Sequence, residues 1–470
     1  MLGTGVEVNL FNDNIEENIH LIKDDNCTVL LHIPSLTFYK LKESLAEAVG
    51  SEEHIDEQLQ SIVEELNTIP ASDVYEENFN KLRKVVLLLE QDCNLSCKYC
   101  YANGGKYESD CISRMDEQKA VKALEALLNR FSEGIESVQM FGGEPLLNFN
   151  GMMSLTNHIC RLCTEKGLPL PVFGIVTNGT LITPEIIDFF NLHNYGVTIS
   201  IDGPKEIHDS QRVYRNNEGT FDIINQNVSL MNMHRKFPLF AEITLTKLHL
   251  EKLKSQDDVI RFIESIRGMR FDAFTFGFAV DLPEEYGITE ENMEVFKRVC
   301  KWIIDYSLES MFTDRPFIIH AGVFLIGKII KNKASSYPCR AGLRNFTVNS
   351  KGEILPCYLF YGKKEYCVKL RNNEETQEAI EHIKNKFMLY NMTSNINDCS
   401  KCWMRNACFT RCPGFSSILY NNMSRPHAIY CAYGKLFMER ILVYLTKNSD
   451  DKEKMKLLNK NLKTFQNMIM

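Results

Sequence analysis

The stretch Cys93-Asn94-Leu95-Ser96-Cys97-Lys98-Tyr99-Cys100 holds three cysteines in a C-x3-C-x2-C spacing, with an aromatic residue just before the last one. Three thiolates this close together cannot complete a tetrahedral zinc site by themselves. They can ligate three irons of a four-iron cluster and leave the fourth iron open to a small molecule. An open iron indicates a catalytic site, because a cluster that only carries electrons normally has all four irons ligated. Half of a zinc site or a chance cluster is the less specific alternative.

Short apolar runs of the length of buried strands begin just before this loop and continue after it. Helical stretches near 115–133, 150–166 and 184–194 separate the runs, and Thr183-Pro184 is typical of a helix start. This alternation predicts an α/β fold with a parallel sheet, whose active site lies at the carboxyl ends of the strands. The six expected strands are residues 85–89, 137–141, 172–176, 197–201, 242–246 and 274–278.

Gly142-Gly143-Glu144-Pro145 follows the second expected strand. Paired glycines let the backbone approach a ligand without a side chain in between, although a double glycine alone is more often an ordinary turn. Together with the cysteine loop one strand–helix unit upstream, this motif resembles the radical S-adenosylmethionine (SAM) enzymes. In that family a GGEP stretch at this point binds the methionine ammonium group of SAM.

The resemblance implies a partial (β/α)6 barrel that binds a [4Fe-4S] cluster and SAM. In the family the open iron chelates SAM, and one electron cleaves it to a 5′-deoxyadenosyl radical that removes a hydrogen atom from the substrate. Ser200 and Arg212 resemble the residues that contact the ribose and the carboxylate of SAM; arginine offers a planar fork for a carboxylate, although a salt bridge or a helix cap is an equally natural role. The other expected cofactor-binding residues are Tyr99, Thr177, Asn178 and Asp202.

Seven of the 16 cysteines form a second pattern late in the chain. The pattern begins with a cysteine, twelve residues, Gly352, four residues and a second cysteine. It continues with C-x2-C-x5-C-x3-C and ends, eighteen residues later, with a final cysteine. This layout resembles the SPASM domain, which adds two auxiliary iron–sulfur clusters to a radical SAM barrel. A zinc ribbon is the alternative that such spacing often indicates. The resemblance assigns Cys339, Cys357 and Cys412 to the first auxiliary [4Fe-4S] cluster, and Cys399, Cys402, Cys408 and Cys431 to the second.

The first auxiliary cluster then has three assigned ligands. Cys367, ten residues after Cys357, or Cys300 could be the fourth. Otherwise the site is open to a thiolate of the substrate, which would suit an enzyme that forms thioether bonds. Cys160 and Cys163 are expected to be core residues.

At 470 residues the chain is long enough for two or three domains. No segment has the length or flanks of a signal peptide or a membrane helix, so we expect a cytoplasmic protein without a membrane partner. Sixteen cysteines in that compartment indicate metal or redox chemistry rather than disulfides.

Residues 1–80 carry 17 Asp and Glu and three Lys, a net charge of −14, against −8 for the whole chain. Two strands (18–23 and 28–33) followed by helices near 41–48 and 52–67 resemble the winged-helix-like element with which many peptide-modifying enzymes bind a leader peptide. In that family the leader adds a strand to the sheet edge and docks on a helix. A DNA-binding winged helix would be basic, so the charge argues against nucleic acid and favours a lysine-rich leader. An N-terminal cap without a ligand is the alternative.

These patterns divide the chain into four regions. The helical run 427–447 is expected to cover the auxiliary clusters, and 452–470 to form a solvated or docking helix. The regions are a recognition element (1–80), the radical SAM barrel (81–310), the SPASM domain (311–450) and a C-terminal helical tail (451–470).

The resemblance covers sulfatase-maturating enzymes, peptide thioether synthases and other peptide cyclases. The sulfatase-maturating branch has an aspartate directly after the second SPASM cysteine as its catalytic base, whereas Tyr358 follows Cys357 here. This departure argues against formylglycine formation. The overall pattern resembles the sactipeptide and ranthipeptide synthases, which implies a cysteine-containing precursor peptide with a leader as substrate.

In such enzymes a peptide cysteine thiolate couples to the carbon that lost its hydrogen, and an auxiliary cluster accepts the surplus electron. Tyr358 is the candidate proton carrier, and a flavodoxin- or ferredoxin-type protein is the expected electron donor. Carbon–carbon crosslinking or epimerisation of a peptide, sulfatase maturation, and an iron–sulfur sensor without enzymatic activity are the alternatives.

Overall fold

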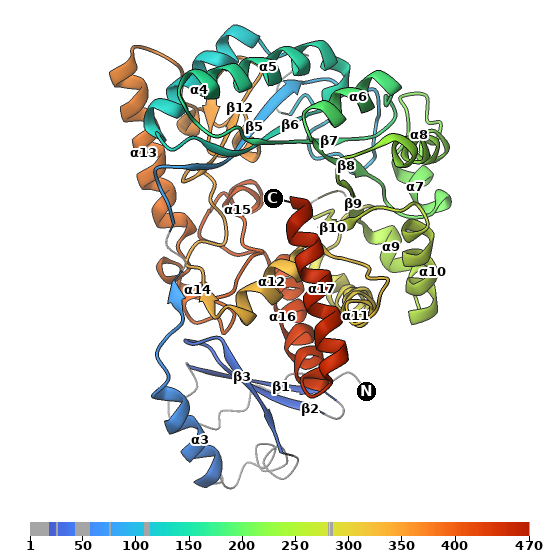
Figure 1. Ribbon diagram of the computed structural model, residues 1–470, viewed down its shortest axis with the longest axis vertical. Coiled ribbons are helices and arrows are strands. Elements are labelled where there is room, and N and C mark those ends of the chain that lie inside the picture. The colour runs from blue at the N-terminus through green and yellow to red at the C-terminus, as the bar shows by residue number, and fades with distance from the viewer. Residues whose placement is uncertain are drawn as a thin grey trace.

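The computed structural model describes residues 18–24, 27–42, 57–74, 77–107, 113–280, 282 and 285–469. Figure 1 shows an α/β part at the top, a small N-terminal sheet at the bottom, and the C-terminal helices α16 (Ala428–Asn448) and α17 (Lys452–Ile469).

A mostly parallel sheet of eight strands carries the functional site, with the strand order β10-β9-β8-β7-β6-β5-β12-β13. The predicted α/β class and its six parallel strands are confirmed, since β5 to β10 pair in parallel with their sequence neighbours. They are β5 (Leu82–Glu90), β6 (Ile135–Gly142), β7 (Val172–Thr177), β8 (Gly196–Ser200), β9 (Leu239–Leu245) and β10 (Ala273–Phe278).

Two short strands from the late part of the chain extend this sheet, which the sequence analysis did not predict. β12 (Asn345–Val348) runs parallel to β5, and β13 (Ile354–Leu355) runs antiparallel to β12. Because β13 ends two residues before Cys357, this extension brings a late cysteine next to the loop that follows β5.

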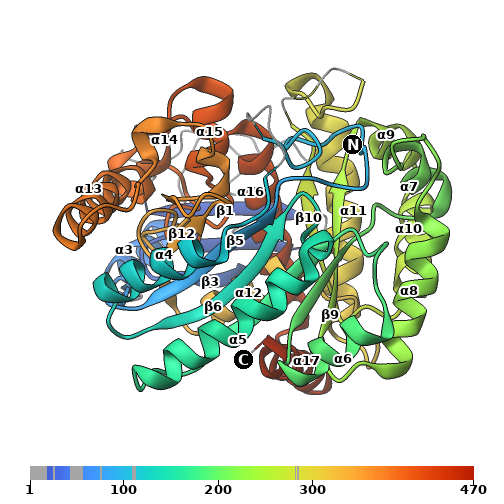
Figure 2. The same ribbon diagram turned by 90° about the horizontal axis from the view of Figure 1, so that it is seen from above.

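Helices cover the outside of the strands, as the view from above shows (Figure 2). The three predicted helices are present as α4 (Glu117–Arg130), α5 (Phe149–Glu165) and α6 (Pro184–Leu192). Thr183 caps α6 as its Thr-Pro start predicted. The remaining helices of this part are α7 (Lys205–Gln211), α8 (Phe221–His234), α9 (Lys247–Lys252), α10 (Gln256–Arg267), α11 (Met293–Ser310) and α12 (His320–Ile330).

The N-terminal region holds three antiparallel strands, β1 (Ile19–Asp24), β2 (Cys27–His32) and β3 (Thr37–Leu41), and helix α3 (Glu57–Asn67). The helix expected near 41–48 is wrong at its start, because Leu41 ends β3; residues 43–48 lie outside the described residues. Thr37-Phe38-Tyr39 combines the branched and aromatic side chains that favour a strand.

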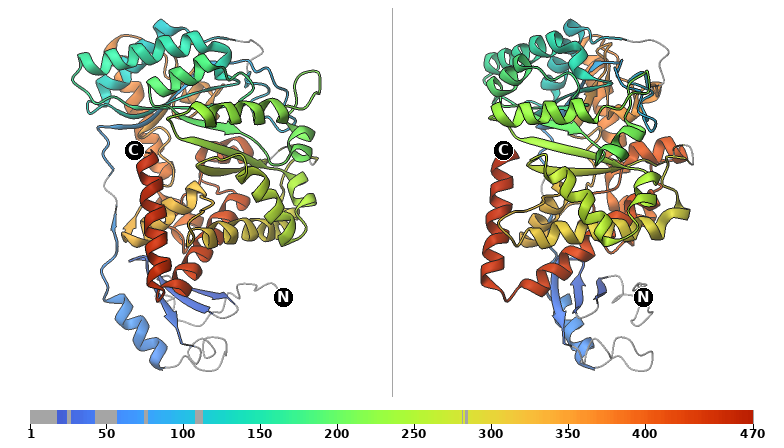
Figure 3. Two further views of the ribbon diagram at one scale, coloured as in Figure 1. Left: turned by 45° about the vertical axis from the view of Figure 1, so that its right-hand side comes forward. Right: turned by 90° about the vertical axis from the view of Figure 1, so that its right-hand side faces the viewer.

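This small sheet shares its core with the rest of the chain. Val29 and Leu31 of β2 pack into the main core, whereas Leu30 faces the other way onto Leu66 of α3. On α16 the buried guanidinium of Arg440 binds the carboxylate of Asp24 at 2.8 Å. Figures 1 and 3 place the sheet against the lower end of the C-terminal helices.

Helix α17 docks along the molecule (Figure 3), which is one of the two arrangements expected for it, a solvated or a docking helix. Leu458, Leu462 and Phe465 are buried, and the ring of Phe465 contacts Phe240 of β9 with centroids 6.4 Å apart. Within the part of the chain that the structure describes, no helix is both long and apolar enough to cross a membrane.

Candidate active site

One cavity of about 610 Å³ brings together motifs that lie far apart in the sequence. Cys93, Cys97 and Cys100 of the loop after β5 line it together with Cys339 and Cys357. The other predicted residues that line it are Tyr99, Gly142, Gly143, Thr177, Asn178, Ser200, Arg212 and Tyr358.

Backbone amides support two of the three cysteines of the first motif. The N–H of Leu95 donates to Cys93 Sγ and the N–H of Gly104 donates to Cys100 Sγ, each at 3.4 Å. Donors of this kind orient a metal-binding thiolate and stabilise its charge. Burial raises the pKa of Cys93 to about 12 and that of Cys97 to about 11, so metal binding at these thiols would release protons.

Among the described residues, no group of three or more His, Cys, Asp or Glu side chains is arranged to hold a single metal ion. A four-iron cluster needs a wider arrangement than one ion, because each of its thiolates bonds a different iron. The three converging thiols therefore fit a cluster by their number and their position on one cavity wall.

Asp202 lies behind the cavity wall and holds two residues that line it. Its carboxylate accepts hydrogen bonds from the Tyr99 hydroxyl at 2.5 Å and from Arg212 Nε at 3.1 Å. Burial opposes its ionisation, but the Arg212 guanidinium keeps the pKa of Asp202 below its usual range. Predicted as a cofactor contact, Asp202 is therefore a residue that positions Tyr99 and Arg212.

Glu144 has a similar supporting place. Its buried carboxylate accepts hydrogen bonds from the Thr177 hydroxyl and the Asn178 N–H, both at 2.7 Å, and from the Leu146 N–H at 3.0 Å. Burial raises the pKa of Glu144 to about 7. Glu144 and the following Pro145 do not line the cavity as described, so Glu144 ties the end of β6 to the end of β7.

The paired glycines are needed for packing as well as for ligand access. Gly142 has a φ of +146°, and a Cβ on it would lie 2.3 Å from the Glu90 carbonyl oxygen. A Cβ on Gly143 would lie 2.2 Å from the Asp92 carbonyl oxygen. Any side chain here would push this turn away from the cysteine loop.

Electrostatic interactions link late cysteines within each of the two predicted sets. In the first set, Cys412 and Cys339 both act on the Cys357 thiol, and burial and then Cys339 raise the pKa of Cys412 to about 12. In the other set, burial and then Cys408, Cys399 and Cys402 raise the pKa of Cys431 to about 12.

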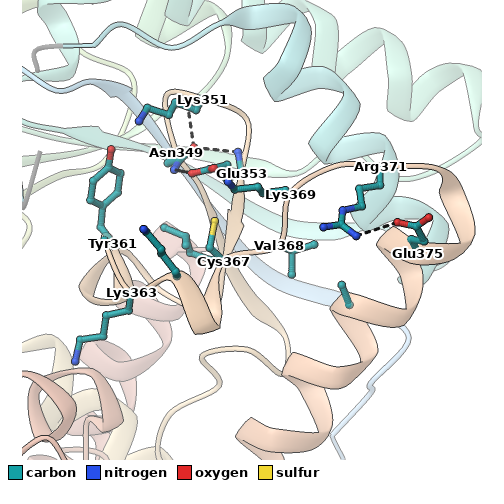
Figure 4. Close-up of a pocket in the computed structure, with 14 residues that line it drawn as sticks. Asn349, Lys351, Glu353, Tyr361, Lys363, Cys367, Val368, Lys369, Arg371 and Glu375 are labelled. Carbon is teal, nitrogen blue, oxygen red and sulfur yellow. Dashed lines mark hydrogen bonds and ion pairs between the residues drawn. The ribbon is translucent and has the colours of Figure 1, made fainter.

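Neither candidate for the fourth ligand of the first set lines the cavity with Cys339 and Cys357. Cys367 instead lines a separate surface cavity of about 780 Å³, beside the start of α13 (Asn373–Asn391) (Figure 4). There, burial and the nearby Glu353 carboxylate raise the pKa of Cys367 to about 12. Cys300 is buried on α11.

Several cavity residues escaped the sequence analysis. Among the described residues that line the cavity, Glu242 of β9 is the only carboxylate, and Lys84 of β5 and Arg212 are the only cations. The ammonium of Lys84 donates to Gln139 Oε1 at 3.1 Å. Burial raises the pKa of Glu242. For Glu242 the available signal was its place as the single charged residue of the otherwise apolar strand β9.

Aromatic side chains form another part of the wall. The ring of Tyr358 lies 5.0 Å from Phe141 and 6.2 Å from Tyr101, measured between centroids. Phe415 and Tyr430 stack at 5.5 Å and line the same cavity. Burial raises the pKa of Tyr358 well above its usual range, which keeps its phenol protonated.

Residues 91–285 match the family model of the Radical SAM superfamily. The "Cysteine-type anaerobic sulfatase-maturating enzyme" of Clostridium novyi (strain NT) is 25% identical over 374 residues, which covers 76% of this chain and 94% of the relative. The "Radical SAM cyclopropyl synthase TigE" of Paramaledivibacter caminithermalis is 23% identical over 391 residues, covering 78% of this chain and 75% of the relative.

Two solved structures share the fold. "Native anSMEcpe with bound AdoMet and Kp18Cys peptide" aligns with a TM-score of 0.64 at 21% identity, over 81% of this chain and 99% of that one. Streptococcus suis SuiB "bound to precursor peptide SuiA" aligns with a TM-score of 0.50 at 15% identity, over 88% and 98%.

The cavity lined by the C-x3-C-x2-C thiols lies within the part of the chain that matches the Radical SAM superfamily. In sequence the chain is similar to anaerobic sulfatase-maturating enzymes, and it shares its fold with SuiB. A radical SAM [4Fe-4S] cluster and SAM are thereby implied.

Proposed function

We propose that this enzyme forms thioether crosslinks between a cysteine sulfur and a carbon atom of a ribosomally made precursor peptide. One observation carries the proposal: thiols of the first motif and of the first late set line the same cavity, while Cys367 and Cys300 lie elsewhere. A substrate cysteine could therefore complete the late set within reach of the site where SAM binds.

In this proposal Cys93, Cys97 and Cys100 hold the radical SAM cluster, and the seven late cysteines hold two auxiliary [4Fe-4S] clusters. When bound, these groups and SAM supply a radical that removes a hydrogen atom from carbon and an acceptor for the one surplus electron. Arg212, which Asp202 orients, would hold the SAM carboxylate, and Ser200 would hold the ribose. The aromatic wall around Tyr358 keeps water away from the radical.

The protein itself must still take the proton of the substrate thiol. Glu242 is suited to this step, because it is the only carboxylate on the described cavity wall and its raised pKa brings it closer to neutral pH. Tyr358, beside Cys357, can pass a proton on, since its phenol stays protonated. Together Glu242 and Tyr358 would offer a proton path without the aspartate that directly follows the second SPASM cysteine in the sulfatase-maturating branch.

The mass of a modified peptide tests this function. We expect that anaerobic co-expression with a cysteine-rich precursor encoded beside the gene yields a peptide that has lost two hydrogens per cysteine protected from alkylation. The same mass loss with freely alkylated cysteines would instead establish carbon–carbon crosslinking, and solvent deuterium uptake without mass loss would establish epimerisation. An unmodified peptide with SAM cleavage still active would point to another protein or peptide substrate.

Sulfatase maturation is the second candidate, because the Clostridium novyi relative matches over 94% of its length. It would convert a single cysteine to formylglycine, which removes two hydrogens and exchanges the sulfur for oxygen, a mass change that the same experiment distinguishes. Tyr358 in place of an aspartate after Cys357 favours the thioether reaction.

We further propose that the N-terminal sheet and α3 bind the leader of the precursor. β3 lies at an edge of the three-stranded sheet, where Tyr39 and Lys40 are exposed, so an extended peptide can add a strand there. Glu64 and Glu65 of α3 are exposed and would attract a lysine-rich segment.

The double charge reversal Glu64→Lys, Glu65→Lys is expected to weaken binding of the precursor about tenfold, since exposed ion pairs contribute up to ~1 kcal/mol each. Cleavage of SAM should be unchanged, because α3 is remote from the cysteine loop. Fluorescence anisotropy with a labelled precursor measures the affinity. Glu125→Lys on the exposed face of α4 is the matched control, and equal affinities of both variants would contradict the role of α3. Point variants are preferable to deletion, which would expose the core face of β2.

A further inference from the structure

We infer that Arg411 raises the reduction potentials of both auxiliary clusters. The inference rests on the proposed function, because it takes the two sets of late cysteines to hold iron–sulfur clusters. Arg411 would act on both cysteine sets at once and so influence the direction of electron flow between the clusters and their donor.

Arg411 is buried in the loop between α14 (Asn397–Ser400) and α15 (Pro413–Tyr420), with 5% of its surface exposed. One of its amino groups, Nη2, donates to the Met423 carbonyl oxygen at 2.7 Å. Its Nε and Nη1 atoms are buried and have no hydrogen-bond partner. Buried donors are nearly always paired, so two unpaired ones on a single guanidinium call for an acceptor.

The groups that surround this guanidinium are thiols from both sets. Its strongest electrostatic partners are Cys399 and Cys408 of the second set and Cys339 and Cys412 of the first. The described residues provide no carboxylate within ion-pair distance of it. Arg411 thus lies between the two predicted cluster sites.

The other buried arginines show how unusual this is. Arg212 pairs with Asp202, Arg340 and Arg344 with Glu77, and Arg440 with Asp24 and Asp305. Placing a guanidinium in a protein interior is unfavourable unless an anion lies against it. For Arg411 the available anions are the cysteine thiolates of the two sets and the sulfide ions of the clusters that these thiolates would bind.

This placement favours the reduced form of each cluster. Reduction adds one negative charge, which a nearby cation stabilises more strongly in a poorly solvated site than at the surface. Hydrogen bonds to cluster sulfur act in the same direction, and both are recognised determinants of iron–sulfur potentials. Because Arg411 interacts electrostatically with thiols of both sets, the two potentials should shift together when it is replaced.

Potentiometric titration of the reconstituted enzyme, followed by electron paramagnetic resonance, tests the inference. Arg411→Gln should lower both auxiliary potentials and leave that of the cluster at Cys93, Cys97 and Cys100 unchanged. Arg411→Lys keeps the charge but not the fork, so its potentials should lie between those of the glutamine variant and the wild type. Lys401→Gln removes the same charge from the exposed side of the second set and should change little, because solvent screens it.

Iron content separates this inference from the proposed function. A wild-type enzyme with iron for one cluster only would overturn the auxiliary clusters themselves. With full iron content, unchanged auxiliary potentials in Arg411→Gln would overturn the role of Arg411 alone. If Arg411→Gln loses iron, the Arg411→Lys variant decides between the two roles. Lowered auxiliary potentials at full iron content in Arg411→Lys support the effect of Arg411 on the potentials. Loss of iron from Arg411→Lys as well refutes that effect and assigns Arg411 a structural role.

Discussion

Replacing Cys97 by alanine is expected to reduce the cleavage of SAM to background. The radical SAM cluster would then have two protein ligands in place of three, and an open iron requires the other three irons to be held. Formation of 5′-deoxyadenosine after reduction with dithionite, together with the iron content, measures the effect. The precursor peptide is not needed for this assay, so its result is independent of the thioether proposal.

The loss should be chemical rather than structural. The loop around Cys97 is held by its backbone, since the N–H of Ser96 donates to the Val213 carbonyl at 2.8 Å and that of Lys98 to the Gln211 carbonyl at 2.9 Å. Cys160→Ala on α5 is the control, because this half-buried cysteine lies outside the cavity. Wild-type amounts of 5′-deoxyadenosine from the Cys97 variant would exclude the loop from the chemistry.

The parts of the fold that follow strong local rules could be predicted from the sequence. The six parallel strands are apolar runs that alternate with helices, and Thr183-Pro184 fixes the start of α6. β12 and β13 have four and two residues, too few for a recognisable pattern. β12 forms because it pairs with β5, and β13 because it pairs with β12. Both pairings are tertiary effects that local preference does not reveal.

For the site, spacing singled out the cysteines of the two motifs, but it did not show what individual polar residues do. Glu144 and Asp202 lie in the right motifs, yet each faces other protein groups: Glu144 accepts from Thr177 and Asn178, and Asp202 from Tyr99 and Arg212. A motif indicates that its residues are needed near a ligand. Residues that contact the ligand and residues that only support those contacts both belong to such a motif.

Residues that belong to no motif are harder still to predict. Lys84 on β5 and Glu242 on β9 interact electrostatically across the cavity. Three strands lie between β5 and β9 in the sheet. Only the curvature of the sheet brings their side chains into one cavity. Only the structure therefore shows that Lys84 and Glu242 share one cavity.

Replacing Glu242 by glutamine is expected to lower thioether formation about 100-fold, the range for removal of a general base, while SAM cleavage continues. Glutamine keeps the size of the side chain, and β9 stays paired with β8 and β10 at this position. The variant should therefore fold and bind peptide. The ratio of crosslinked peptide to 5′-deoxyadenosine, measured in one reaction, separates loss of the base from loss of the radical.

The pH dependence gives a second readout. Burial raises the pKa of Glu242, so its basic form is lost at a higher pH than for an ordinary carboxylate. Crosslinking by the wild type should fall as the pH drops through this raised pKa, and the residual activity of Glu242→Gln should lack that step. Glu251→Gln, an exposed change on α9, is the matched control. An unchanged product ratio in Glu242→Gln would assign the proton to another acceptor and leave Glu242 as the counter-ion of Lys84.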